Sequence, residues 1–159
     1  MTVEQDATLF DKNIAELASR AARGEVIVKE ELGITEQEME AMYAVAYNLF
    51  QNKKYDDAIK SFSLLAMFNP MEYKYIFGIG SCFHMKGEYA VASMYYVMAS
   101  ALDEEQAAPF LHTAECMLAI KDEEGARDSL NIAISKAKGN KQFAPIQQRA
   151  EVMLTNMSA

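Results

Sequence analysis

Apolar positions between residues 39 and 140 repeat with a period of 34 residues. Four sets of equivalent positions, which we call columns, follow this period. Two columns contain only Ala and Gly, and two contain apolar residues of mixed size. They are Ala46, Gly80 and Ala114; Ala58, Ala92 and Ala126; Phe62, Tyr96 and Leu130; and Leu65, Ala99 and Ala133. Because only Gly or Ala lets two helices approach closely without overpacking, we expect the small columns where paired helices cross.

Within each repeat the apolar spacing predicts two helices joined by a tight turn. First helices are expected at about 36–52, 72–86 and 106–120, and second helices at about 55–68, 89–102 and 123–138. Asn69-Pro70 ends the first repeat, Gly87 marks a turn and Gly139 closes the last helix. A helix-turn-helix period of 34 residues is the signature of tetratricopeptide (TPR) repeats. We therefore predict an all-α fold in which three tandem TPR repeats form a right-handed superhelix.

Two further helices are expected outside the repeats. Apolar residues at helical spacing between Leu9 and Ala21 predict an amphipathic helix that stops near Gly24. Thr35 and Glu38 then form a predicted capping box for the first repeat. A last helix, at about 143–157, is a candidate cap for the end of the solenoid. The predicted regions are 1–38 (N-terminal helix and linker), 39–140 (repeats 39–72, 73–106 and 107–140) and 141–159 (C-terminal cap).

Composition narrows the range of partners and compartments. The formal net charge of −8 disfavours nucleic acid and anionic membrane surfaces as partners. No run of 18 apolar residues is present, and residues 1–6 lack the pattern of a secretory signal, so we expect a cytosolic protein. Cys82 and Cys116 lie 34 residues apart inside apolar helical patterns, and we interpret them as buried free thiols. A disulfide or redox pair is the alternative, which a reducing cytosol disfavours.

The first helix of each repeat should present one face to the inside of the superhelix. Its residues lie at repeat positions 5, 9, 12 and 13. They are Tyr43, Tyr47, Phe50 and Gln51; Phe77, Ser81, His84 and Met85; and Leu111, Glu115, Leu118 and Ala119. The first half of this face is aromatic and apolar, which predicts a trough that binds a peptide. The alternative, that single aromatic residues here belong to the core, stays open.

No chemistry of catalysis or of cofactor binding stands out. His84 and His112 fall on different predicted helices without a nearby nucleophile or metal-ligand partner, so neither catalysis nor a metal site is expected. The sequence contains no CxxC motif, no GxxxxGK[ST] motif and no GxGxxG motif. An enzyme is therefore the least favoured class, and no cofactor is expected.

A family resemblance covers the chain from about Gly24 to Ala137. The run YAVAYNLFQNKKYDDAIKSFSLLAMFNP is followed by YIFGIGSCFHMKGEYAVASMYYVMASALD and then by PFLHTAECMLAIKDEEGARDSLNIAI. Together, GIGSC and FLHTAEC make this pattern more specific than a TPR period alone. The chain resembles the class II chaperones of bacterial type III secretion systems, which attend the hydrophobic translocator subunits that form a pore in the host membrane.

The resemblance implies a function and a site. It implies that an extended translocator segment with apolar anchors lies in the concave TPR face and stays soluble there before secretion. The implied client-binding residues are Tyr43, Tyr47, Phe50, Phe77, Ser81, His84 and Met85, with Leu65 and Phe68 as walls. Relatives commonly use the N-terminal region in homodimers, which implies dimerisation through Leu9, Phe10, Ile14, Leu17 and Ala21. The alternative is a generic TPR adaptor for another apolar peptide or partner protein.

Overall fold

The structure is a computed structural model that describes residues 13, 15–17, 19–21 and 23–157. Over these residues the chain is helical and contains no strand. The helices are α2 (Val28–Glu31), α3 (Glu36–Gln51), α4 (Tyr55–Phe68), α5 (Tyr73–Met85), α6 (Tyr89–Leu102), α7 (Ala108–Ala119), α8 (Glu123–Ala137), the short 3-10 helix η1 (Lys141–Phe143) and α9 (Ala144–Met157). The helices predicted from residue 36 onward are all present, with ends within two residues of the expected positions.

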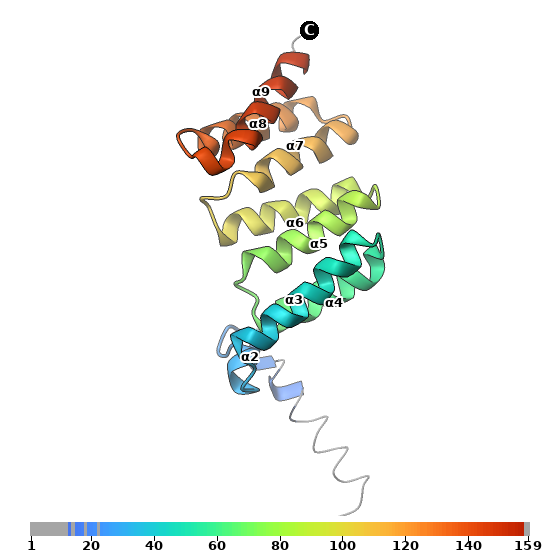
Figure 1. Ribbon diagram of the computed structural model, residues 1–159, viewed down its shortest axis with the longest axis vertical. Helices are drawn as coiled ribbons and strands as arrows, with labels where there is room; N and C mark the ends of the chain where they lie inside the picture. The colour runs from blue at the N-terminus through green and yellow to red at the C-terminus, as the bar shows by residue number, and fades with distance from the viewer. Residues whose placement is uncertain (1–12, 14, 18, 22, 158–159) are drawn as a thin grey trace, which may run out of the picture.

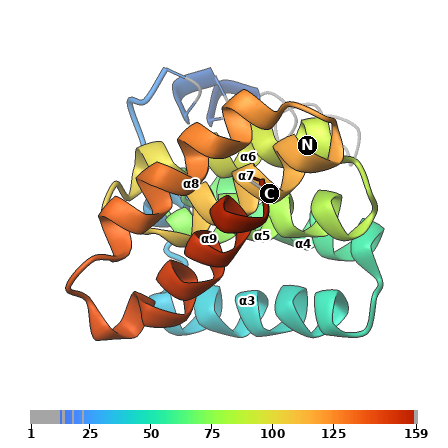
Figure 2. The same cartoon turned by 90° about the horizontal axis from the view of Figure 1, so that it is seen from above.

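Helices that follow one another in the chain pack side by side. The helix α3 packs on α4, α5 on α6 and α7 on α8, and each pair stacks on the next through α4 with α5 and α6 with α7. Figure 1 shows these pairs stacked along the long axis of the molecule, with α9 packed on α8 at the C-terminal end. Seen along that axis in Figure 2, α3 and α8 run in different directions, so successive pairs are turned relative to one another. The all-α prediction of stacked TPR helix pairs is confirmed.

The repeating columns form the core. All six residues of the small columns are buried, and the five alanines among them are 0% exposed. Gly80 shows why small size matters, because a Cβ atom there would lie 3.1 Å from the Cβ of Tyr95 and 3.2 Å from the ring of Tyr96. The column of large residues is also buried, with Phe62 at 2% and Leu130 at 0% exposed. Small and large columns together therefore set the spacing between α5 and α6 and between the other paired helices.

The turn inside each repeat uses the same backbone conformation. Lys53, Gly87 and Lys121 occupy equivalent positions, and their φ angles are 60°, 79° and 66°. Glycine adopts this left-handed region without strain, whereas a lysine there costs roughly 1 kcal/mol. At the start of α3, the predicted capping box is present: Glu38 N–H donates to Thr35 Oγ1, and Thr35 N–H donates to the Glu38 carboxylate.

The N-terminal segment is only partly described. Leu17 and Ala21 lie in its helical part and are half-buried, whereas Leu9, Phe10 and Ile14 lie outside the described residues. An ion pair of 3.3 Å between Arg20 and Glu31 joins this segment to α2. The predicted role of these five apolar positions in dimerisation is untouched by this placement and stays a prediction.

Candidate functional site

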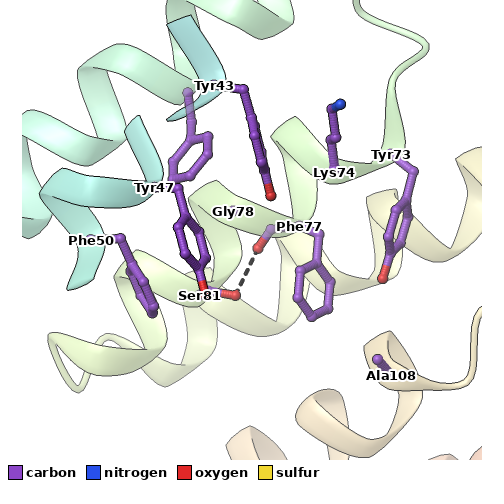
Figure 3. Close-up of a pocket in the computed structure, with 10 residues that line it drawn as sticks. Tyr43, Tyr47, Phe50, Tyr73, Lys74, Phe77, Gly78, Ser81 and Ala108 are labelled. Atoms are coloured by element: carbon purple, nitrogen blue, oxygen red, sulfur yellow. Dashed lines mark hydrogen bonds between the residues drawn. The ribbon is translucent and has the colours of Figure 1, made fainter. Parts of the chain in front are cut away.

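A cavity lined by aromatic side chains opens between the first and second helix pairs. It has a volume of about 270 Å³. We call it the aromatic cavity; its lining residues are Tyr43, Tyr47, Phe50, Phe62, Tyr73, Lys74, Phe77, Gly78, Ser81 and Ala108. Figure 3 shows the aromatic side chains of α3 facing those of α5 across this space. The five predicted residues Tyr43, Tyr47, Phe50, Phe77 and Ser81 therefore lie together, as the helical spacing predicted.

Contacts between rings hold the aromatic cavity open and ordered. Tyr43 and Tyr47 stack with ring centroids 6.3 Å apart, and Tyr47 lies 6.4 Å from Phe50. On the opposite wall, Tyr73 stacks on Phe77 with centroids 5.4 Å apart. Such pairs fix ring orientation. The cavity is therefore preformed, which lowers the entropy that an incoming side chain must lose on binding.

Gly78 lets α5 approach the floor of the aromatic cavity. A Cβ atom at Gly78 would lie 2.8 Å from two ring atoms of Phe62, a distance that real Cβ atoms do not tolerate. Phe62 belongs to a repeating core column, and its ring lines the cavity from below because Gly78 makes room for it. At the rim, Lys74 Nζ lies 4.8 Å from the centroid of the Tyr43 ring, a cation–π contact, and forms an ion pair with Glu40.

A second cavity of about 340 Å³ adjoins the first and is more polar. We call it the polar cavity; its lining residues are Phe50, Ser81, His84, Met85, Tyr96, His112, Glu115 and Arg149. Phe50 and Ser81 line both cavities, so the two form one continuous groove along α3, α5 and α7. The predicted residues His84 and Met85 lie in its polar half.

A chain of hydrogen bonds orders the polar cavity. Ser81 Oγ donates to the carbonyl oxygen of Phe77 at 3.0 Å, and Tyr96 Oη donates to Ser81 Oγ at 3.5 Å. The Nδ1 atom of His84 lies 3.2 Å from Tyr96 Oη. The Tyr96 hydroxyl therefore links Ser81 on one side to His84 on the other.

Charged groups close the far side of the polar cavity. His112 Nδ1 lies 2.9 Å from Glu115 Oε2, and Arg149 Nη2 lies 2.7 Å from Glu115 Oε1. Burial acts to raise the pKa of Glu115, but the hydrogen bond with His112 and the charge of Arg149 outweigh it, and the pKa lies below its ordinary value. Burial lowers the pKa of His84. At neutral pH the cavity therefore holds an ionised Glu115 and an uncharged His84.

The structure corrects one of the two predictions about the walls of the groove. Leu65 is 1% exposed inside the core and lines neither cavity, because it belongs to the buried column that continues at Ala99 and Ala133. Phe68 packs against the same core at the end of α4 and also lines neither cavity. Leu65 was therefore wrongly assigned as a wall, whereas the role of the half-buried Phe68 stays a prediction.

The expectation that His84 and His112 lack a nearby metal-ligand partner is also wrong. Ligand atoms of these two side chains and of Glu115 lie within 4.8 Å of one another. The two rings belong to different helix pairs, and only the stacking of α7 on the preceding pair brings them together.

Several groove residues were missed. Tyr73 lies one helical turn before Phe77, a spacing that could have indicated it. Tyr96 was identified only as a member of a repeating column; it is 1% exposed, yet its hydroxyl reaches the polar cavity. Arg149 enters from α9, far along the chain, and no sequence signal links that helix to the groove.

Comparison with known proteins places the chain in a family. A tetratricopeptide repeat model matches residues 39–68. Low calcium response locus protein H of Yersinia pestis is 30% identical over 122 residues, which cover 76% of this chain and 72% of that protein. The type III secretion translocator chaperone SycD of Yersinia enterocolitica superposes with a TM-score of 0.79 at 25% identity, covering 82% of this chain and 98% of that one. The chain belongs to the type III secretion translocator chaperones.

One solved relative of this chaperone family carries a bound partner segment. PcrH in complex with the chaperone binding region of PopD superposes with a TM-score of 0.76 at 30% identity, covering 79% of this chain and 95% of that one. Among the helices that the structure describes here, none has both the length and the apolar character needed to cross a membrane.

Proposed function

We propose that this chaperone binds hydrophobic translocator subunits of a bacterial type III secretion system in the bacterial cytoplasm and keeps them soluble before secretion. The observation that carries the proposal is the aromatic cavity, which opens on the surface of a chaperone-family fold. A solved complex of the relative PcrH with the chaperone binding region of PopD supports this assignment.

The groove suits an extended segment with apolar anchors. The aromatic cavity, at about 270 Å³, is large enough for one bulky apolar side chain or two small ones. Tyr47 is 48% and Met85 56% exposed, so both the aromatic and the polar cavity offer uncovered apolar surface. An extended client segment presents alternate side chains to such a surface. While these side chains are bound, the client cannot use them to aggregate.

We assign client contact to the predicted residues that line the groove. They are Tyr43, Tyr47, Phe50, Phe77, Ser81, His84 and Met85. Leu65 is left out because it is buried in the core beneath the groove, whereas Phe68 is kept as a wall at the end of α4. Lys74, in its ion pair with Glu40, lies at the rim next to the aromatic wall.

Co-expression tests the function directly. The chaperone is produced together with each hydrophobic translocator subunit encoded beside it, and the soluble fraction and co-purification of that subunit are measured. We expect the subunit to be soluble and to co-purify only when the chaperone is present. If every such subunit is equally insoluble with and without the chaperone, the proposal is wrong.

We also propose a homodimer in the client-free state, formed through the N-terminal segment. Leu17 and Ala21 are half-buried in a helical stretch that joins α2 through the ion pair of Arg20 with Glu31. The relative SycD has been solved as an alternative dimer. Deletion of residues 1–23 should yield a monomer by sedimentation. A full-length protein that is already monomeric at the same concentration contradicts this arrangement.

A further inference from the structure

Both histidines of the chain meet in the polar cavity. The sequence contains two histidines, His84 on α5 and His112 on α7. Their ring centroids are 6.0 Å apart with the planes nearly perpendicular. Glu115 lies one turn after His112 on the same face of α7, since its carboxylate contacts that ring. Ligand atoms of all three side chains lie within 4.8 Å of one another.

The atoms of the three side chains already point toward a common space. His112 Nδ1 lies 2.9 Å from Glu115 Oε2, and a divalent ion bound between these two atoms displaces the proton that they share. His84 Nδ1 lies 3.2 Å from Tyr96 Oη, and the Nε2 atom of His84 takes part in no hydrogen bond among the described residues. A histidine whose other ring nitrogen is held by a hydrogen bond is a common metal ligand.

Glu115 adds an oxygen that hydrogen bonding does not satisfy. Its Oε1 atom is buried and has no hydrogen-bond partner among the described residues; Arg149 Nη2 contacts it as an ion pair at 2.7 Å. The Arg149 side chain is 61% exposed, so it can move into solvent and leave the carboxylate to another cation.

The distances fit a small transition metal after modest side-chain movement. Zinc bonds of about 2.0–2.1 Å place tetrahedral ligand atoms about 3.3 Å apart. Contraction from 4.8 Å requires each ligand atom to move by about 1 Å. All three residues are only half-buried, and rotation about their side-chain bonds supplies such movement without a change in the helices.

We propose that His84, His112 and Glu115 form a binding site for a divalent transition metal of the zinc type inside the groove. Two imidazoles and one carboxylate are a ligand set that zinc accepts, with a fourth position for water or for an atom of a bound peptide.

Metal titration of the full-length protein, with any affinity tag removed, tests the site. Zn²⁺ binding is followed by calorimetry, and Co²⁺ binding by its visible absorption. We expect one ion per chain with nitrogen and oxygen ligation. Substitutions His84→Gln and Glu115→Gln should each weaken binding at least tenfold, whereas Glu104→Gln, an exposed control, should not change it. Equal affinity in all four proteins overturns the proposal.

A gain of affinity separates ligation from loss of fold. Substitution of Arg149 by Ala removes the cation that competes for Glu115, so zinc should bind several-fold more tightly. A misfolded variant cannot produce that gain. Co²⁺ spectra with strong thiolate charge-transfer bands would instead place the ion on the cysteines and overturn the assignment. None of these measurements involves a translocator, so their failure leaves the proposed chaperone function intact.

Discussion

Truncation of one groove residue, Tyr47→Ala, should weaken client binding by an amount that follows from its exposure. The residue is 48% exposed, and an aromatic side chain of roughly 200 Å² then offers about 100 Å² to a partner. Burial of that area at about 25 cal/mol per Å² contributes about 2.5 kcal/mol, or about 60-fold in affinity. A bound peptide that covers only part of this area gains less free energy, so we expect the substitution to lower the affinity at least tenfold.

Stability should change little in the same variant. Tyr47 contacts Tyr43 and Phe50 at the mouth of the aromatic cavity, and it is absent from the buried core cluster of the first two helix pairs. We expect a loss of less than about 1 kcal/mol of unfolding free energy, because half of the side chain already faces solvent.

The assay is fluorescence anisotropy with a labelled peptide that spans the chaperone-binding region of a translocator shown to co-purify. A matched control is Val45→Ala: Val45 lies on α3, is 59% exposed and lines neither cavity. The control should bind the peptide as the unmodified protein does. If Tyr47→Ala binds within twofold of the control, the aromatic cavity is not the client site. If its melting curve collapses, the residue belongs to the core.

Three further predictions concern the scaffold. Substitution Gly80→Leu should cost at least about 3 kcal/mol by overpacking α5 against α6, and an unchanged melting temperature would refute the helix-pair packing. Lys53→Gly and Lys121→Gly should each stabilise by about 1 kcal/mol, or 2–4 °C in Tm, by relieving a positive φ; a lower Tm contradicts this. Burial raises the pKa of both Cys82 and Cys116 to about 12, so neither thiol should react with a disulfide reagent at neutral pH until the protein unfolds, and fast labelling of the folded chain would disprove their burial.

Helix positions and the core columns were predictable because each depends on spacing along the chain. An amphipathic helix has apolar residues at a regular spacing along the chain. In a tandem repeat, the same spacing and the same helix packing occur three times. The capping box at Thr35 and the turn at Gly87 are likewise local, since each involves residues only a few positions apart. The aromatic cavity followed for the same reason: Tyr43, Tyr47 and Phe50 are neighbours on one helix face.

The predictions were less accurate where one helix packs against two neighbouring helices. Leu65 was expected on the groove wall, but stacking of the second helix pair on the first covers it completely. The ring of Tyr96 lies in the core, as the other large residues of its column do, yet its hydroxyl reaches the polar cavity and contacts His84. The position of a residue in the repeat therefore predicted whether the residue is buried, but it did not predict which polar contacts the residue makes.

By itself, the sequence determined the helices, their order, the close-packed columns and the aromatic half of the groove, because all of these arise from contacts within one repeat or between adjacent ones. His84, Met85 and Glu115 of the polar half were also expected on the inner face, but only the tertiary structure decided which polar groups contact one another there. There, His84, His112, Glu115 and Arg149 come from α5, α7 and α9, and their meeting depends on the angle at which successive helix pairs stack. That angle results from packing along the whole molecule, and no local period encodes it.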